Sequence, residues 1–274
     1  MSRRPEHQAP PEVYYGIDEA SKYTQNTRVI EVQEKCSERA LELLALPDDT
    51  SALLLDLGCG SGLSGEIISN QGHMWIGLDI ASAMLDVAVE RELDGDLILA
   101  DIGQGMPFRA GMFDGAISIS AVQWLCYADS RQHKPGKRLY QLFMTLYACL
   151  SRGSRAVFQF YPENDAQVEL IVSQAMRAGF TGGLVVDYPN STKAKKIYLV
   201  LMTGGTTQLP KGLQEEGTNQ TQALYQRREQ LKKIRSGKLS RHDWIMKKKE
   251  RRRKQGKEVR SDSKYTGRKR SGRF

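Results

Sequence analysis

The segment from Leu53 to Gly62 (Leu-Leu-Leu-Asp-Leu-Gly-Cys-Gly-Ser-Gly) has the residue types and the spacing of a nucleotide-cofactor site. An apolar run, typical of a buried parallel strand, leads into three glycines spaced two apart, and a turn without Cβ atoms lets the backbone approach a ligand. The helix predicted over 63–70 offers free N–H groups at its N-terminus. Asp79 closes a second apolar run 23 residues after Asp56, where a carboxylate can accept hydrogen bonds from both hydroxyls of a ribose.

The glycine spacing separates two classes of cofactor. In the dinucleotide fingerprint Gly-x-Gly-x-x-Gly the third glycine follows the second by three residues, whereas here Leu63 has that place and Gly62 comes one residue early. Asp56 beside the turn would repel a pyrophosphate, but it suits a cofactor that carries a cationic amine and a sulfonium. The pattern therefore resembles class I methyltransferases, which bind S-adenosylmethionine, more than nicotinamide-dependent dehydrogenases. A third apolar run ends in Asp101, where the acid of such methyltransferases contacts the adenine amine.

The composition is that of a globular α/β domain with extensions. Of the 274 residues, 40% are hydrophobic, which is enough for one core. No apolar run reaches the roughly 18 residues that cross a bilayer, and the basic N-terminus lacks the apolar region of a secretion signal. Neither the 4 cysteines nor the 4 histidines have the spacing of metal ligands, so we expect reduced thiols and no bound metal.

Charge divides the chain into two parts. Residues 1–210 hold 18 Lys and Arg against 25 Asp and Glu, a net charge of −7, whereas residues 211–274 hold 22 against 7, a net charge of +15. Polar and helix-breaking residues around the change predict a linker over 206–222. The basic tail over 223–274 is expected to be partly disordered, and its composition is that of a segment that binds RNA phosphates or directs nuclear import.

Alternating strand and helix patterns predict an α/β protein with a Rossmann-like class I methyltransferase fold. We expect a mostly parallel seven-stranded sheet with one antiparallel strand at its C-terminal end, because the last two strands are joined by a loop short enough for a hairpin. The expected strands are 53–57, 74–79, 97–101, 113–118, 155–161, 183–188 and 196–202. The expected helices are 28–46, 63–70, 83–91, 138–150 and 166–178. The predicted domains are an N-terminal lid and helix over 1–46 and a methyltransferase domain over 47–205, followed by the linker and the tail.

Several further segments resemble one narrower family. They are Pro-Pro-Glu-Val-Tyr-Tyr at 10–15, Glu-Ala-Ser-Lys-Tyr-Thr at 19–24 with Arg28, Ser-Ile-Ser-Ala-Val-Gln-Trp-Leu at 118–125, Phe-Tyr-Pro-Glu-Asn at 160–164, and Gly-Gly-Leu-Val-Val-Asp-Tyr-Pro-Asn-Ser at 182–191. With the basic tail, they make nearly the whole chain similar to the eukaryotic small-subunit (18S) ribosomal RNA guanine-N7 methyltransferases. The resemblance implies methylation of guanine N7 in that RNA, a part in 40S subunit biogenesis, and residence in the nucleus, the nucleolus and also the cytoplasm.

The resemblance also implies roles for individual residues. The residues expected at the cofactor are Tyr14, Lys22, Tyr23, Arg28, Asp56, Gly58, Cys59, Gly60, Asp79, Ile80, Asp101, Ile102 and Ser118. At the target base we expect Ser120, Gln123 and Trp124, with Trp124 stacked on the guanine and Gln123 hydrogen-bonded to its edge. Guanine N7 carries a lone pair and no proton, so the transfer needs no general base. Proximity and orientation can then supply most of the acceleration.

The resemblance implies two partners, small-subunit ribosomal RNA in the pre-40S particle and a small zinc-binding activator protein that forms a heterodimer with the enzyme. The activator is expected to dock along the edge of strand 97–101, where no proline or lysine blocks pairing. Four cations in the loop 131–138 are interpreted as contacts to RNA phosphates. We expect no membrane association.

Two other functions stay open on the sequence. The acidic body would also suit a methyltransferase for a cationic protein side chain or small molecule, although the basic tail argues against this. Alternatively, the chain could be a non-catalytic ribosome-assembly factor that keeps the methyltransferase fold. Measuring RNA methylation and subunit maturation separately distinguishes the second alternative from the enzyme.

Overall fold

The computed structural model describes residues 4–47, 50–130, 133–191, 194–204 and 209–213, and the single residues 246, 249, 253, 261 and 262. The chain forms two compact units, 1–214 and 215–274. Residues 206–208 and 214–222 of the predicted linker, and most of the predicted tail, lie outside the described residues. In the second unit, Lys249 donates a hydrogen bond to Asp262 (2.7 Å). The described helices and strands of the fold belong to the first unit, apart from isolated helical residues in the second.

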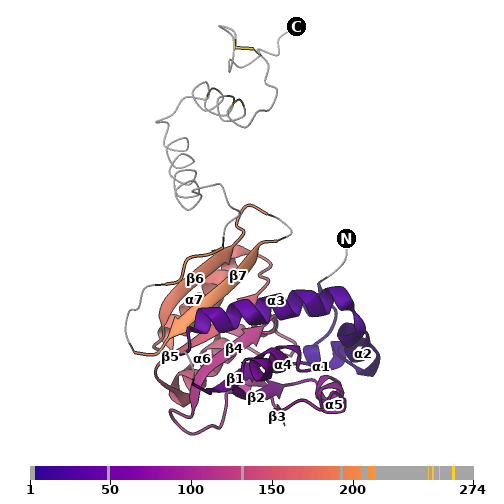
Figure 1. The fold of residues 1–274 in the computed structure, drawn as a ribbon. Coiled ribbons are helices and arrows are strands. Elements are labelled where there is room, and N and C mark those ends of the chain that lie inside the picture. Colours follow the sequence, from indigo (N-terminus) through magenta and orange to yellow (C-terminus); the bar gives the residue numbers. More distant parts are fainter. Residues whose placement is uncertain are drawn as a thin grey trace. The chain divides into compact units, whose positions relative to one another are not determined.

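A seven-stranded sheet forms the centre of the first unit (Figure 1). The strands lie in the order β3-β2-β1-β4-β5-β7-β6. They are β1 (Leu53–Leu57), β2 (Met74–Asp79), β3 (Asp96–Leu99), β4 (Phe113–Ile119), β5 (Leu150–Phe160), β6 (Thr181–Asp187) and β7 (Lys196–Met202). Strand β7 runs antiparallel to β5 and β6, and all other neighbours pair in parallel. The predicted fold class, with one reversed strand near the C-terminus, is confirmed.

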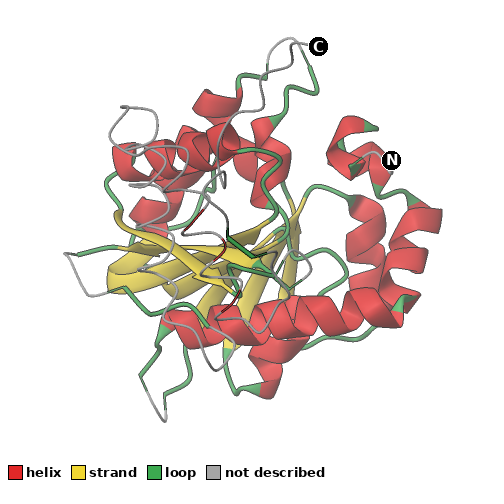
Figure 2. Cartoon of the chain, turned by 90° about the horizontal axis from the view of Figure 1, so that it is seen from above, coloured by secondary structure: helices red, strands yellow, loops and turns green. Residues whose placement is uncertain are grey.

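Helices cover both faces of the sheet (Figure 2). Helices α3 (Thr27–Leu44), α4 (Leu63–Asn70) and α5 (Ser82–Glu90) lie on one face, and α6 (Pro135–Cys149) and α7 (Asp165–Arg177) lie on the other. The side chains of β1 alternate between the two cores, as a doubly covered strand requires. Leu54 packs in the core that contains Ala40 of α3, while Leu55 packs in the core that contains Phe143 of α6. No helix among the described residues is long and apolar enough to span a membrane.

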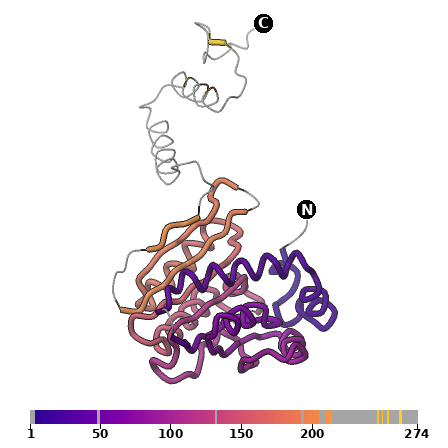
Figure 3. Tube along the Cα trace, viewed as in Figure 1, coloured from indigo at the N-terminus to yellow at the C-terminus, as the bar shows by residue number. Residues whose placement is uncertain are grey.

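The N-terminal segment lies at one end of the sheet, beside α5 (Figure 3). It contains the 3₁₀ helix η1 (Pro5–His7) and the short helices α1 (Pro11–Tyr14) and α2 (Ile17–Gln25). The Arg4 guanidinium ties it to the loop after β5 by donating to the carbonyls of Tyr161 (2.7 Å) and Pro162 (2.9 Å). The His7 ring stands edge-on to Tyr127. These contacts hold the segment near the carboxyl ends of the central strands.

Strand β5 differs most from its predicted bounds, because it begins at Leu150 rather than at Arg155. The triplet 152–154 (Arg-Gly-Ser) falls between the predicted helix 138–150 and the predicted strand 155–161, and in the structure it is part of the strand. Phe113 of β4 pairs with Leu150, and Gly115 pairs with Arg155, so the register shifts between the two pairs. The irregularity accommodates the extra residues, and Gly153 inside it has a φ of +86°. A turn-forming tripeptide therefore sits in a bulged strand.

Candidate functional site

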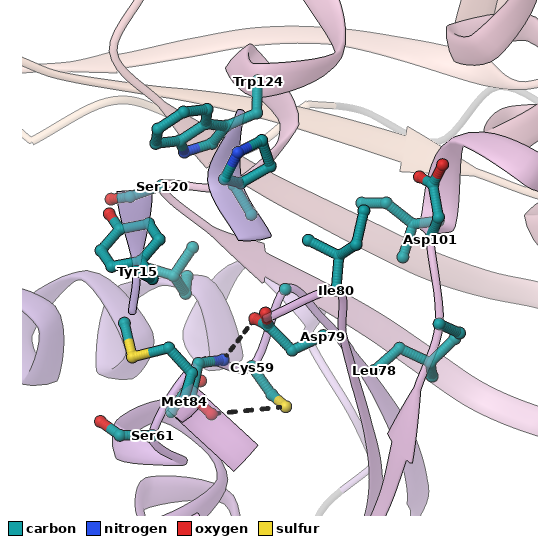
Figure 4. A pocket seen from close by; sticks show the side chains of 18 of the residues that line it. Tyr15, Cys59, Ser61, Leu78, Asp79, Ile80, Met84, Asp101, Ser120 and Trp124 are labelled. Carbon is teal, nitrogen blue, oxygen red and sulfur yellow. Dashed lines mark hydrogen bonds between the residues drawn. The ribbon is translucent and has the colours of Figure 1, made fainter. Parts of the chain in front are cut away.

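A cavity lies at the carboxyl ends of the central strands, next to the point where the strand order reverses. Strands β2 and β3 lie on one side of β1, and β4 to β7 lie on the other. Because the central strands are parallel, the segments that follow them meet at one edge. Asp79 lies between Asp101 at one end of the cavity and Trp124, Tyr15 and Ser120 at the other (Figure 4). The predicted site residues that line it are Tyr23, Gly58, Cys59, Gly60, Asp79, Ile80, Asp101, Ile102, Ser120 and Trp124.

The glycine turn places bare backbone against the cavity. Gly58, Gly60 and Gly62 have φ values of +76°, +55° and +77°, a region that residues with a Cβ rarely adopt. Packing also excludes a side chain at position 58, because a Cβ there would lie 2.3 Å from the Cβ of Ala121. The N–H of Gly58 donates to the carbonyl of Leu78 (2.7 Å), which fixes the turn to the end of β2.

Asp79 holds the turn from the neighbouring strand. Its Oδ2 accepts a hydrogen bond from the N–H of Gly60, and its Oδ1 accepts one from the N–H of Ala81, both at 2.8 Å. Burial raises the pKa of this carboxyl, and the N–H donors act against the rise. Since each carboxylate oxygen has a second lone pair, Asp79 can still accept hydrogen bonds from the hydroxyls of a ligand.

Asp56 lies behind the turn and is fully buried without lining the cavity. Its Oδ2 accepts a hydrogen bond from the Ser64 hydroxyl (2.5 Å), whereas its Oδ1 is buried without a hydrogen-bond partner. Burial raises the pKa of Asp56 to about 7; the Ser64 hydroxyl lowers it, and the nearby Asp79 carboxylate raises it further. The ionised form is therefore unfavourable until a positive charge comes close.

Ser120, directly after β4, begins the opposite wall of the cavity. Its φ of +57° is rare for a residue other than glycine and is typical of strained positions at functional sites. Its hydroxyl donates to Oε1 of Gln159 (2.8 Å) and accepts from Nε2 of Gln33 (3.4 Å). Gln33 also lines the cavity. The sequence reasoning missed it, because a single glutamine on an amphipathic helix has no distinguishing spacing.

Aromatic rings complete this wall. Trp124 lies in the 3₁₀ helix η3 (Val122–Cys126), and its ring centroid is 5.8 Å from that of Tyr15 and 6.0 Å from that of Tyr14. Tyr15 stands edge-on to Tyr23, with centroids 5.8 Å apart. Burial raises the pKa of both Tyr15 and Tyr23, so both phenols stay neutral. Tyr15 lies next to Tyr14 in the family-like segment 10–15, and the residue types alone do not show which of the two rings lines the cavity.

Arg138 lies in the cavity wall and not on the exposed loop surface that its neighbouring cations predicted. It was interpreted as one of four cations that contact RNA phosphates, yet its side chain is only 11% exposed. Its Nη2 donates to both carboxylate oxygens of Asp101, at 2.7 and 2.8 Å. Arg138 is therefore part of the cavity and does not offer its charge to RNA, which corrects that interpretation. Of the other three cations, Lys134 and Lys137 are exposed and Arg131 lies outside the described residues.

The remaining predicted site residues do not line the cavity. They are Tyr14, Lys22, Arg28, Asp56, Ser118 and Gln123. Lys22 and Arg28 are exposed on α2 and α3. Ser118 is buried inside the sheet, where its hydroxyl donates to a carbonyl of β1 (2.8 Å). Gln123 is also buried, and its Nε2 donates to the carbonyl of Ser120 (2.8 Å), so this amide supports the wall from behind.

Relatives with curated names match the chain over its full length. It is 57% identical over 277 residues to the 18S rRNA (guanine-N(7))-methyltransferase of Mus musculus, with 100% of this chain and 99% of the relative covered. It is 54% identical over 289 residues to the protein of that name from Arabidopsis thaliana, with 100% of each covered. The chain belongs to the 18S rRNA (guanine-N7)-methyltransferase family. The family predicted from the sequence segments is thereby confirmed.

Two family models match separate parts of this methyltransferase. A general methyltransferase domain matches residues 55–158, and the model described as a methyltransferase involved in Williams-Beuren syndrome matches residues 201–272, which include the basic tail. The fold is similar to that of the magnesium protoporphyrin IX methyltransferase of Synechocystis PCC 6803, with a TM-score of 0.52 and 14% identity over 74% of this chain and 99% of that one. At such low identity the likeness establishes the fold alone.

The cavity fits S-adenosylmethionine on three observations. The glycine turn leaves room for a ligand against its backbone. The carboxyls of Asp56, which is buried, and Asp79, which is half-buried, have raised pKa values; a positive charge nearby would favour their ionised forms and a pyrophosphate would disfavour them. A third carboxylate, Asp101, lies at the far end of the same cavity. The described residues contain no group of three metal-ligating side chains that could hold a metal ion.

Proposed function

We propose that this chain transfers a methyl group from S-adenosylmethionine to N7 of a guanine in 18S ribosomal RNA and takes part in the biogenesis of the 40S subunit. The observation that carries the proposal is the cavity wall around Ser120 and Trp124, which holds no available base among its described residues. Burial raises the pKa values of Tyr15, Tyr23 and Cys59, so these groups stay protonated and neutral. A wall of this kind suits an acceptor atom that has a lone pair and no proton.

The carboxylates that line the cavity are Asp79, Asp101 and Asp129, and the last two flank the Arg138 guanidinium. Asp79 is held by two backbone N–H groups and Asp101 by the Arg138 guanidinium. We assign Asp79 to the ribose hydroxyls and Asp101 to the adenine amine, with the glycine turn against the amino-acid portion. Ile80, Ile102 and Tyr23 line the same cavity. When bound, S-adenosylmethionine supplies an electrophilic methyl group on its sulfonium.

The chain's own contribution to the reaction is orientation and exclusion of water. Trp124 is only 8% exposed but lines the cavity, and we assign to it the aromatic surface on which a guanine that has left its stack lies. Tyr15 and Tyr23 continue the apolar wall toward the cofactor end. Holding N7, the methyl carbon and the sulfur in line can contribute on the order of 7–11 kcal/mol in favourable cases. Such alignment suits a reaction without proton transfer.

Labelled methyl transfer tests this function. We expect the chain, purified in complex with the zinc-binding activator protein, to transfer label from S-adenosylmethionine to pre-40S particles, and borohydride and aniline treatment to cleave 18S RNA at the new N7-methylguanine. Label in protein or in a small molecule instead would favour another acceptor. Normal subunit maturation with a variant that transfers no label to RNA would show that the presence of the protein is its main duty.

Replacing Trp124 by alanine is expected to lower the rate of RNA methylation about tenfold, because stacking of one base on an aromatic ring contributes roughly 1–3 kcal/mol. Trp124→Phe keeps an aromatic surface and should retain most of the rate. Affinity for S-adenosylmethionine, measured by calorimetry, should change little in either variant. Equal methylation rates for the alanine variant and the wild type would remove Trp124 from the target-base site.

We propose further that a small zinc-binding activator protein docks on the edge of β3. Support comes from the sheet order, in which β3 is an outer strand with a single neighbour. Ile98 and Leu99 of this strand are 37% and 60% exposed. An edge strand with exposed apolar side chains is a template for pairing with another chain. On its own, the chain is then expected to be poorly soluble or inactive.

Leu99→Asp tests the edge, because it places a charge where the activator would bury an apolar side chain. Loss of that burial is expected to weaken the complex at least tenfold, since a buried leucine contributes about 1.5–3 kcal/mol. Leu184→Asp changes a leucine that is 40% exposed on β6, at the other end of the sheet, and serves as the control. Co-purification of the activator with both variants alike would place it elsewhere.

For the cell, we propose residence in the nucleus and nucleolus, where small-subunit RNA is made, and also in the cytoplasm. The basic tail supports this, because its charge suits both an import signal and contacts with RNA phosphates. Its most basic run, 247–254, lies mostly outside the described residues.

A further inference from the structure

Asp101, which was assigned to the adenine amine, forms an ion pair at the end of the cavity with Arg138, an arginine that has no assigned role of its own. Arg138 and Asp101 are each 11% exposed at their side chains, and one guanidinium nitrogen contacts both carboxylate oxygens. Oδ1 of Asp101 also accepts a hydrogen bond from the N–H of Gly103 (2.8 Å), while Oδ2 lies 3.4 Å from Nε2 of Gln104. Oδ2 is thus the oxygen with the weaker second donor.

The surrounding backbone is shaped to seat this guanidinium. Gly103 lies in the 3₁₀ helix η2 (Ile102–Gln104), and a Cβ on it would come within 2.5 Å of Nε of Arg138. Nη1 of Arg138 lies 4.0 Å from a carboxylate oxygen of Asp129 and 3.5 Å from Nδ1 of His133. An arginine side chain that is nearly buried, between two carboxylates and close to a glycine, has little freedom to move.

We propose that Arg138 is a positioning residue for the cofactor, because it holds the Asp101 carboxylate in the orientation that accepts the exocyclic amine of adenine. This inference rests on the proposed function, since it assigns the adenine to this end of the cavity. Without the guanidinium, the nearly buried Asp101 carboxylate loses its counter-charge and can rotate. The adenine amine then meets a carboxylate that is no longer held in one orientation. Arg138 touches Asp101 and need not touch the ligand.

Calorimetric titration of the full chain, in complex with the activator proposed above, with S-adenosylmethionine and S-adenosylhomocysteine tests the proposal. Arg138→Ala is expected to raise Kd about tenfold for both ligands, because both carry the same adenine. The hydrogen bond from its amine to a displaced Asp101 carboxylate is then weakened, and hydrogen bonds to charged groups are the strong ones. Arg138→Lys retains a point charge and should recover part of the affinity. Arg109→Ala, which removes an exposed arginine, is the matched control and should leave Kd unchanged.

A ligand without the amine separates positioning from general stability. The purine analogue of S-adenosylhomocysteine, which lacks the exocyclic amine, should bind wild type and Arg138→Ala with the same Kd. In RNA methylation, Arg138→Ala should raise KM for the cofactor and leave kcat and KM for RNA near their wild-type values. If the alanine variant does not fold, the same comparison is made with Arg138→Lys.

Several results would overturn the proposal. Equal Kd values of wild type and both Arg138 variants for S-adenosylmethionine would do so, as would an equal loss of affinity for the amine-free analogue. A rise in KM for RNA with an unchanged cofactor Kd would make Arg138 a phosphate contact. If the wild type itself bound neither cofactor, the proposed function would fail together with this inference, whereas binding by the wild type with no effect of Arg138 rejects this inference alone.

Discussion

Asp79→Asn is expected to weaken the binding of S-adenosylmethionine about 100-fold, because two charged hydrogen bonds to the ribose are lost at roughly 1.5–3 kcal/mol each. The variant also disturbs the glycine turn. An asparagine has one oxygen and one amide nitrogen where Asp79 presents two acceptors, so either Gly60 or Ala81 would face a second N–H donor. Methylation at low cofactor concentration should fall in proportion to this loss.

Stability and affinity should separate in this variant. Burial raises the pKa of Asp79, so the folded chain gains nothing in stability from holding its charge in the empty cavity. We therefore expect Asp79→Asn to stay folded, with a far-ultraviolet circular dichroism spectrum like that of the wild type. Asp86→Asn removes an exposed carboxylate from α5 and is the control. A Kd for Asp79→Asn within about threefold of the wild-type value, less than one such hydrogen bond is worth, would remove Asp79 from the ribose site.

The donor side of the cavity was largely predictable, because its constraints lie in neighbouring residues. The backbone at positions 58 and 60 has a positive φ, which favours glycine, so the conformation can be read from the residue type. The position of an acid at the end of a parallel strand follows from the position of the strand. The spacing of three glycines and Asp79 therefore predicts both the turn and the edge of the sheet where it lies. The same holds for the reversed strand, which follows from a short loop between two apolar runs.

The ion pair of Arg138 was not predictable, because its partner Asp101 lies 37 residues away on another element. In sequence, Arg138 is one of several cations near a loop, and only the start of α6 at Pro135 turns it toward the cavity. Gln123 is a second residue whose surroundings were not predictable. It was expected at the target base, but the rotation of η3 directs its amide to the carbonyl of Ser120. The phase of a short 3₁₀ helix cannot be read from five residues.

The carboxyls of Asp56 and Asp79 affect both the stability of the fold and the binding of a ligand at this edge of the sheet. Asp56 is buried there behind the half-buried Asp79, whose carboxylate raises the pKa of Asp56. A folded chain with an empty cavity therefore carries negative charge that it does not stabilise. A cationic methyl donor relieves this, whereas the neutral sulfur of the demethylated product does so less.

The pH dependence of unfolding measures this strain at Asp56. Its pKa is about 7 in the folded chain, against an ordinary value of 3.8. Between these values the folded form keeps a proton that the unfolded form has lost, so the free energy of unfolding falls as pH rises through the window and levels off above it. From pH 5 to pH 8 the wild type should therefore lose about 2–3 kcal/mol more than Asp56→Asn, which has no proton to release there.

Urea unfolding at the two pH values checks this, and the comparison with Asp56→Asn cancels the contributions of other titrating groups. Ser64→Ala removes the hydroxyl that lowers the pKa of Asp56, so it should extend the fall to higher pH. S-adenosylmethionine should reduce the fall in the wild type, because its positive charge favours the ionised carboxylate. Parallel pH profiles for wild type and Asp56→Asn would mean that Asp56 ionises in the folded chain near its ordinary pKa, and that the buried acid is not what prepares the cavity for a cation.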